Sequence, residues 1–515
     1  MKNFLSRFES LITGVLSGFD RLVFRGNLIP FHLPHGMFRH LDRAGIRLLD
    51  FKDYAVQTSE NVKEAALAEA RQGGRPVRYL ESSDISKEDL ARTLLDENPT
   101  DSGIVCALTA VEPCMSFEYH RSQDENERGF RLRQRKCLFV YQYRLHPRVG
   151  FMNARIQTWF PFAVQVCLNG REWLSRQLDE AKIAYIRHDN CFPWVKDLPA
   201  AQRLIEEQLT TDWPALLREI ARSLNPLHDK IFSAWPMDYY WSTYQTEWAT
   251  DVLFRDTTAL DSVYPAFVRQ AVQHFQSPDV MRFLGRKTNT RFLGELTTRF
   301  KNRPEGVRVK HWVNGNSIKM YNKGGSVLRI ETTLANVRDF KVLRPRHDQP
   351  NAKLKWQPLR KGVADLHRRA EVSGAANGRY LDALSVVDDS TTLATILDAV
   401  ARPTTYRDKR VRALRTGDPD DVALLSAVAH GEFTTAGFRN RDIRRLLHPD
   451  SMDATPDDVR RISARVGRQL RILRAHGIIR KVPKSHRYVL TARGHQLTSA
   501  ISAARNATIK QLLAA

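Results

Sequence analysis

Residues 307–334 constrain the fold of this chain more than any other segment does. Asn314 and Gly315 stand between two runs in which apolar and polar residues alternate. Asn-Gly in this setting is the strongest short-range signal for a two-residue hairpin loop. Gly324 and Gly325 mark a second turn. The segment is therefore predicted to be a three-stranded antiparallel meander.

The register of the second hairpin follows from its side chains, because a slip of one residue exchanges the two faces of a strand. A two-residue loop would place Met320 opposite Arg329. A three-residue loop, residues 324–326, instead keeps apolar side chains opposite one another. The pairs it predicts are Met320 with Ile330, Tyr321 with Arg329, and Lys319 with Glu331.

One face of the predicted meander is apolar, and the other combines charged residues with a tyrosine. The apolar face consists of Val309, Ile318, Met320 and Ile330. The polar face has two rows, of which the first is Arg308, Tyr321 and Arg329 and the second is Lys310, Lys319 and Glu331. His311 faces Ile318 on the apolar side.

A tyrosine between two arginines suits covalent attack on a phosphodiester. The guanidinium groups would favour the phenolate and neutralise the charge that gathers on the phosphate. Glu331 could hold a divalent metal, Mg²⁺ or Mn²⁺, on the scissile phosphate, while Lys319 or Lys323 binds a neighbouring one. The simpler alternative is a solvated hairpin face with a tyrosine stacked on cations.

The same residues carry a family resemblance. Ser317-x-x-x-Tyr321-Asn322-Lys323, followed by Arg329-x-Glu331, resembles the motif around the nicking tyrosine of rolling-circle replication initiators, the plasmid Rep and filamentous-phage gene II-type proteins. The resemblance implies that Tyr321 forms a 5′-phosphotyrosine, with Lys323 as its basic companion and Glu331 as the acid on the next strand. It implies a metal-dependent endonuclease of replication initiation, encoded by a plasmid or mobile element.

The sequence departs from that family in its metal ligands. Many initiators carry a His-hydrophobic-His motif upstream, and this chain has none. A metal site would have to be assembled from separate groups. The candidates are His311, Asp20, Glu112 and Glu118.

Residues 200–284 are predicted to be helical, with Tyr239–Phe254 as the most aromatic helix. Glu247 and Asp251, four residues apart, would share one face of it, and with Asp20 they would form the RNase H-like acidic set of a transposase or nuclease. The aromatic side chains of this helix are expected in the core, with stacking on single-stranded bases as the alternative. They are Tyr239, Tyr240, Trp241, Tyr244 and Trp248.

The last 57 residues, Val459–Ala515, contain thirteen Lys and Arg residues and no Asp or Glu. At about 100° per residue an apolar stripe forms on one side of a helix, made of Val459, Ile462, Val466, Leu470 and Leu473. The arginines of the opposite side are Arg461, Arg465, Arg468 and Arg471. Such a helix buries one face and offers the other to a polyanion.

Two helices precede this one, around residues 422–430 and 438–447, and a hairpin and a closing helix follow it. The order resembles the winged helix-turn-helix of MarR-like regulators. The resemblance implies that the helix from Val459 enters a major groove and that Lys481, Lys484 and Arg487 of the hairpin lie along phosphates. A winged helix that binds another protein is the alternative.

The predicted fold class is α+β, an antiparallel-sheet N-terminal body with a helical insertion, plus a C-terminal winged helix-turn-helix. The predicted divisions are an α+β region at 1–199, the insertion at 200–286, the meander that completes the body at 287–360, a helical connector at 361–421 and the DNA-binding domain at 422–515.

Charge and composition restrict the function classes. The net charge is +23, and residues 401–515 alone hold 23 basic and 10 acidic residues. No run of eighteen apolar residues, Cys-x-x-Cys pair or nucleotide-binding motif occurs, so a cytoplasmic location is expected, without a membrane or a structural zinc. The expected partners are double-stranded DNA at the winged helix and single-stranded DNA at the body, with RNA and a homodimer left open. A non-catalytic transcriptional regulator is the alternative to the nicking enzyme.

Overall fold

The computed structural model describes residues 1–82, 84–120, 129–275, 277–285, 296–338, 340–345, 354–385, 393–430, 433, 437–449, 455–482 and 485–506. The chain forms two compact units. Unit 1 consists of Met1–Ile12, Asp256–Asn314 and Ala375–Ala515, and unit 2 of Thr13–Arg255 and Gly315–Gly374. Both contain helices and strands, so the predicted α+β class is confirmed.

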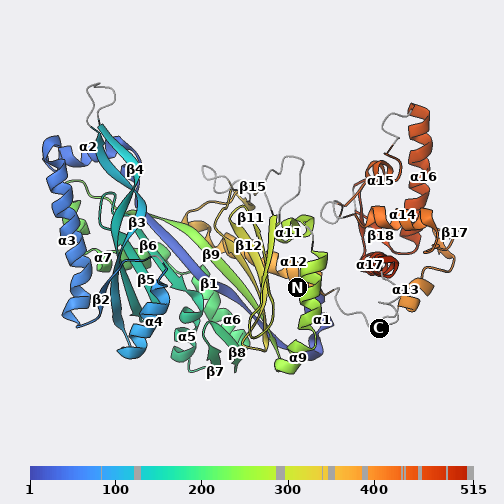
Figure 1. Cartoon of the computed structure of the whole chain (residues 1–515), viewed down its shortest axis with the longest axis horizontal. Helices are drawn as coiled ribbons and strands as arrows, with labels where there is room; N and C mark the ends of the chain where they lie inside the picture. Colours follow the sequence, from blue (N-terminus) through green and yellow to red (C-terminus); the bar gives the residue numbers. More distant parts are fainter. Residues whose placement is uncertain are drawn as a thin grey trace. The chain divides into compact units, whose positions relative to one another are not determined.

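A large sheet organises unit 2 (Figure 1). In sheet order its strands are β12 (Asn316–Lys323), β13 (Val327–Leu334), β9 (Tyr239–Phe254), β1 (Ile12–Leu28), β6 (Val164–Asn169), β5 (Gly150–Gln157), β4 (Gly129–His146), β3 (Gly103–His120) and β2 (Val77–Leu80). The edge strand β2 is parallel to β3, so the sheet is mixed rather than antiparallel throughout.

Helices cover both faces of this sheet (Figure 1). On one face lie α2 (Pro34–Arg43), α3 (Phe51–Gln72) and α7 (Trp213–Leu224), which share one apolar core with the strands. In α3 the buried residues recur at helical spacing, at Ala55, Val62, Ala66 and Ala70. On the other face α4 (Lys87–Glu97) packs near β3 and β4, whereas α5 (Gly170–Glu180) and α6 (Leu198–Glu206) pack near β1 and β9.

The predicted helix at Tyr239–Phe254 is wrong, because these residues form the strand β9 between β13 and β1. Tyr, Trp and Thr make up eight of its 16 residues, and such residues favour a pleated strand. Tyr239, Trp241 and Trp248 are buried, as expected of core residues, whereas Tyr240 and Tyr244 are exposed. Strand β9 therefore interrupts the predicted insertion, in which α6, α7 and α8 (His228–Ile231) precede the strand and α9 (Thr257–Asp261), α10 (Tyr264–Arg269) and α11 (Ser277–Phe283) follow it.

Both turns of the meander and the register of its second hairpin are as predicted. Strand β11 (Arg308–Val313) ends before Asn314 and Gly315, which have φ angles of 49° and 80° and lead directly into β12. Between β12 and β13 the loop has three residues, and the predicted pairs form: Met320 with Ile330, Tyr321 with Arg329, and Lys319 with Glu331. The polar face is not solvated, however, because Tyr321, Arg329 and Glu331 are all buried.

Unit 1 contains a strand pair and several short helices besides its C-terminal part. The pair is β10 (Leu296–Lys301) with β11, and the helices are α1 (Lys2–Arg7), α9 (Thr257–Asp261), α10 (Tyr264–Arg269) and α11 (Ser277–Phe283). The predicted connector holds α12 (Leu366–Leu384), α13 (Leu393–Asp398) and the hairpin β16 (Thr404–Tyr406) and β17 (Lys409–Val411), so it is only partly helical. Unit 2 has a further pair, β14 (Lys341–Arg344) with β15 (Lys355–Pro358).

The C-terminal part consists of three helices, a hairpin and a last helix around one apolar cluster. Its elements are α14 (Pro419–Val428), α15 (Asn440–Leu447), α16 (Pro456–Ala475), β18 (Ile479–Lys481), β19 (Tyr488–Leu490) and α17 (Ala492–Asn506). In α16, Val466, Leu470 and Leu473 are buried, which confirms the predicted stripe. Among the residues that the structure describes, no helix is both long and apolar enough to span a bilayer.

Candidate functional site

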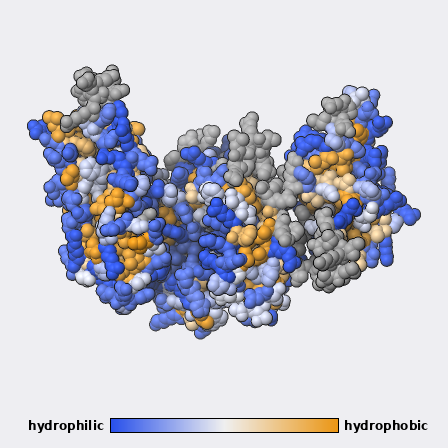
Figure 2. All heavy atoms as spheres, in the orientation of Figure 1, coloured by the Kyte–Doolittle hydropathy of each residue, from blue (hydrophilic) through white to orange (hydrophobic). Residues whose placement is uncertain are grey.

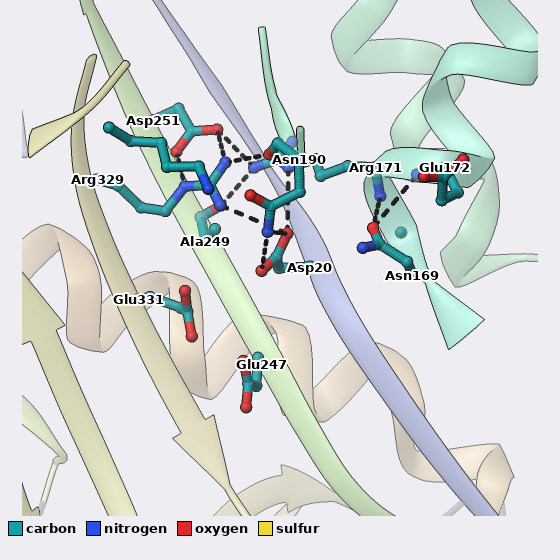
Figure 3. Close-up of polar contacts among 12 residues, drawn as sticks. Asp20, Asn169, Arg171, Glu172, Asn190, Glu247, Ala249, Asp251, Arg329 and Glu331 are labelled. Carbon is teal, nitrogen blue, oxygen red and sulfur yellow. Dashed lines mark hydrogen bonds and ion pairs between the residues drawn. The ribbon is translucent and has the colours of Figure 1, made fainter. Parts of the chain in front are cut away.

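Three carboxylates meet on three adjacent strands of the sheet (Figure 3). Asp20 comes from β1, Glu247 from β9 and Glu331 from β13, and one oxygen of each lies within 4.8 Å of the others. Register explains the meeting, since Glu331 pairs with Ala249 and Glu247 is two residues away on the same face of β9. Asp20 and Glu331 are buried, whereas the Glu247 side chain is 17% exposed.

A buried ion-pair network lies beside the three carboxylates. Arg329 pairs with Asp251 in the ladder and donates from Nε to Oδ1 at 2.6 Å and from Nη2 to Oδ2 at 2.9 Å. Arg171 approaches the same carboxylate from α5, with Nη2 at 2.9 Å from Oδ2. Both guanidinium groups also reach Oδ1 of Asp20, at 3.5 Å and 4.0 Å. The network thus links Asp251 to the carboxylate cluster.

The turn from β6 into α5 positions Arg171. The Asn169 side chain caps the helix by accepting hydrogen bonds from the backbone N–H of Arg171 and Glu172. Gly170 lies so close to β1 that an added Cβ would be 1.9 Å from the carbonyl oxygen of Phe19. Only glycine permits this approach, which brings Arg171 next to the residue that follows Phe19, Asp20.

A tight hairpin covers the site. It consists of β7 (Tyr185–His188), Asp189, Asn190 and β8 (Cys191–Val195). Asn190 Nδ2 donates to both oxygens of Asp20 at 2.8 Å, and the Asn190 carbonyl accepts from Arg329 Nη2 at 2.6 Å. Asp189 pairs with Lys323 at 2.7 Å. Lys323, the predicted companion of the tyrosine, is therefore tied to the hairpin.

Tyr321 and Lys319 of β12 both contact Glu331. The Tyr321 hydroxyl donates to Oε2 at 2.8 Å. The Lys319 ammonium lies 2.6 Å from Oε1 of Glu331. It also lies 3.9 Å from Oε2 of Glu247. The meander thus brings Tyr321, Lys319, Arg329 and Glu331 together, as the sequence predicts, but it directs Arg329 to Asp251.

The pKa directions describe a site that is short of positive charge. Burial raises the pKa of Asp20 above its ordinary value, against the opposing charge of Arg329. Burial also raises the pKa of Glu331, and Glu247 adds to this while Lys319 opposes it. Burial would raise the pKa of Asp251 too, but Arg329 and Arg171 outweigh it and hold that pKa below its usual value.

The predicted stabilisation of the Tyr321 phenolate is wrong. Burial, followed by the charge of Glu331, raises the pKa of Tyr321 well above its ordinary value, although Arg329 acts in the opposite direction. The phenol therefore keeps its proton at neutral pH and donates it in the hydrogen bond to Glu331. Arg329 does not activate the tyrosine because its hydrogen bonds go to Asp251 and Asn190.

The chemistry of the cluster suits a hard divalent cation. Mg²⁺ and Mn²⁺ prefer carboxylate oxygens, and Mg²⁺ is usually held by one or two carboxylates together with water and substrate phosphate. Four carboxylates, those of Asp20, Glu247, Asp251 and Glu331, are contacted by three cationic side chains. These are Arg171, Lys319 and Arg329. A divalent cation on the three clustered oxygens would supply the missing positive charge.

The other predicted metal ligands lie outside this cluster. His311 accepts or donates at both ring nitrogens, with the Thr298 hydroxyl at 2.9 Å and the Tyr380 hydroxyl at 3.2 Å. Burial lowers the pKa of His311 to about 4. Glu112 pairs with Arg155 and Lys87, and Glu118 pairs with Arg133 and Arg135. Arg308, predicted beside Tyr321, is part of unit 1, opposite Lys301.

The predicted basic face of α16 is exposed, with Arg461, Arg465, Arg468 and Arg471 on the surface. Arg461 pairs with Asp458 at 2.9 Å and Arg465 with Asp420 at 3.1 Å. Among hairpin residues, Lys481 is exposed and Arg487 donates to the Gly437 carbonyl at 3.2 Å. Lys484 lies outside the described residues.

Sequence reasoning missed Arg171 and Asn190, and it gave Asp20 and Glu247 a minor place. Asp20 and Glu331 are more than three hundred positions apart, and no local pattern connects them. Asn169-Gly170 before an amphipathic segment was the one usable signal, because it marks a capped helix that starts close to a strand. No protein-family model, curated protein or solved structure matches this chain.

Proposed function

We propose that this chain is a metal-dependent nuclease or strand-transfer enzyme that acts on DNA. Asp20, Glu247 and Glu331 would hold Mg²⁺ or Mn²⁺, which would activate a nucleophile and stabilise charge on the scissile phosphate. The observation that carries the proposal is the approach of these three carboxylates to within 4.8 Å on adjacent strands. This is close to the RNase H-like acidic set considered from sequence, with Glu331 in the place of Asp251.

In this proposal each neighbouring residue has a separate role. Tyr321 and Lys319 orient Glu331, since one hydrogen-bonds Oε2 and the other pairs with Oε1. Asn190 fixes the Asp20 carboxylate. Asp251 compensates the buried charges of Arg329 and Arg171. These are positioning residues, whereas the three clustered carboxylates would touch the metal.

A covalent mechanism through Tyr321 is a second candidate, and one contact favours it. The hydroxyl lies 2.8 Å from Glu331 Oε2, so a carboxylate is in place to accept the phenolic proton. Attack of the phenolate on phosphorus would form a phosphotyrosine and release the 3′-hydroxyl of the preceding nucleotide. This is the nicking and rejoining reaction implied by the resemblance to rolling-circle initiators.

The C-terminal part would supply DNA binding as a winged helix. Support comes from the element order, the basic exposed face of α16 and the hairpin β18 and β19. On this proposal α16 lies in a major groove and Lys481 and Arg487 lie near phosphates. A plasmid or mobile element is the setting in which a nicking or strand-transfer domain joined to a DNA reader is expected.

One assay separates the candidates. Labelled single-stranded and duplex DNA are incubated with the protein and Mg²⁺ or Mn²⁺, and products are separated under denaturing conditions. We expect metal-dependent cleavage that is lost in Glu331→Gln and retained, though slower, in Tyr321→Phe. A protein–DNA adduct absent in Tyr321→Phe would favour the covalent mechanism. DNA binding without cleavage or adduct across diverse substrates would favour the alternative function, a non-catalytic transcriptional regulator.

A further inference from the structure

A row of polar side chains crosses unit 2 next to the carboxylate cluster. In the strand register Tyr141 of β4 is opposite Arg155 of β5, Arg155 is opposite Gln165 of β6, and Gln165 is opposite Arg25 of β1. The Gln165 amide oxygen accepts from both arginines, at 3.2 Å from Arg155 and 3.4 Å from Arg25. One glutamine therefore fixes two guanidinium groups on one surface of the sheet.

The row continues onto β9 through a stacked pair. The Arg25 guanidinium carbon lies 3.5 Å from the centroid of the Tyr244 ring. Tyr244 remains 43% exposed and Tyr240, four residues earlier, is 51% exposed. An aromatic ring that is held by an arginine and open to solvent offers a platform for a nucleobase, and the arginine beside it offers charge to a phosphate.

The row carries an excess of positive charge. Glu112 is its acidic member, and it is already paired with Arg155 at 2.5 Å and with Lys87 at 3.2 Å. Within the described residues the Arg25 guanidinium contacts the Gln165 amide and the Tyr244 ring rather than a carboxylate. Figure 2 shows hydrophilic residues over much of the visible face, with hydrophobic patches among them.

The row leads to the carboxylate cluster along two strands. On β1 the exposed Arg21 lies between Arg25 and Asp20, and on β9 Glu247 follows Tyr244 by three positions. Arg21 directly follows Asp20, and its Nε donates to Cys167 Sγ of β6 at 3.3 Å. Five residues of strand from Asp20 to Arg25 span roughly 17 Å, a distance that a short stretch of polynucleotide covers.

We propose that this surface, made of Arg21, Arg25, Arg155, Tyr240 and Tyr244, binds a single polynucleotide strand and leads it to the carboxylates. The proposal rests on the proposed function, in which the carboxylate cluster is the site of cleavage, and it adds the path of the strand to that site. A single strand is the occupant because its unpaired bases have faces free to stack on Tyr244, whereas bases in a duplex stack on each other.

The test is strand binding by the full chain in EDTA, where metal-dependent cleavage is prevented. Fluorescence anisotropy is recorded with labelled oligo(dT) and oligo(rU), each with excess unlabelled duplex to occupy the C-terminal part. Tyr244→Ala and Arg25→Ala should each weaken binding about tenfold, and Tyr244→Phe should bind like the wild type because its ring still stacks. Tyr79→Ala, at a 57% exposed tyrosine of β2, is the matched control and should have no effect.

Unchanged binding of both oligonucleotides in Tyr244→Ala and Arg25→Ala, with thermal midpoints equal to the wild type, would overturn the proposal. A direct readout comes from oligonucleotides containing 5-iodouracil, which should cross-link on irradiation to the peptide that contains Tyr244. The two failures are distinguishable. Weakened binding in the variants without any cleavage by the wild type rejects only the nuclease, whereas cleavage with unchanged binding rejects only this surface.

Discussion

At the scale of single residues, Glu331 is a buried carboxylate that contacts the Lys319 ammonium and the Tyr321 hydroxyl. Its pKa and that of Asp20 lie above their ordinary values of 4.5 and 3.8. The folded state therefore binds these protons more tightly than the unfolded state. Each group favours folding below its unfolded pKa, and this contribution is lost as the pH rises through the folded pKa.

Glu331→Gln should therefore stabilise the metal-free protein at pH 7 and change little near pH 4, where the native carboxyl is protonated. Each kcal/mol gained would raise the thermal midpoint by about 2–4 °C. Mn²⁺ should raise the midpoint of the wild type at pH 7 and not that of the variant. Scanning calorimetry with EDTA and with Mn²⁺ measures both effects, and a variant less stable than the wild type in EDTA at pH 7 would contradict this account.

Asp251 differs from the clustered carboxylates because its two arginine partners are fully buried. Asp251→Asn leaves those charges without compensation and should cost about 3–5 kcal/mol of unfolding free energy. Glu247→Gln is the matched control, since its side chain is partly exposed and the change should cost less than about 1 kcal/mol. Urea denaturation measures both, and equal losses would argue against separate structural and metal-binding roles.

At the scale of elements, turn chemistry predicted the meander correctly, whereas helical periodicity was right for α16 and wrong for β9. Asn314, Gly315 and the two glycines of the next turn fixed the meander and its register. The segment Tyr239–Phe254 was misjudged because its aromatic residues also fit a helical spacing. Glu247 and Asp251 share one face in the strand, as they would in the predicted helix. Residues four positions apart lie on the same face of either element.

Helix α16 is the element whose arginines carry the predicted contact with DNA. Arg468 and Arg471 are exposed and have no ion pair within the described residues, so their charges are available to phosphates. Arg468→Ala and Arg471→Ala should each reduce the slope of log K against log salt by about 0.9 for duplex DNA. Arg47→Ala, at an exposed arginine of unit 2, should leave the slope unchanged. Equal slopes for all three variants and the wild type would contradict the predicted contact between α16 and duplex DNA.

At the scale of the whole molecule, the sequence predicted individual elements such as the meander better than the way distant elements assemble the carboxylate cluster. The meander brought four residues of the site together locally, because hairpin register is decided within about twenty residues. Asp20, Arg171 and Asn190 come from strand β1, helix α5 and the hairpin of β7 and β8, and their positions depend on the order of strands in the sheet. Strand order is set by long-range packing, so the carboxylate cluster could only be proposed as one of several acidic sets.

The central claim is that Asp20, Glu247 and Glu331 together hold one divalent cation. Its most direct test is Mn²⁺ binding by the full chain, followed by electron paramagnetic resonance with Glu112→Gln as the control acid. We expect one tight site per chain in the wild type and in the control, and loss of that site in Asp20→Asn and in Glu331→Gln with the fold retained. Mn²⁺ binding that is equal in the wild type and these two variants would contradict the claim.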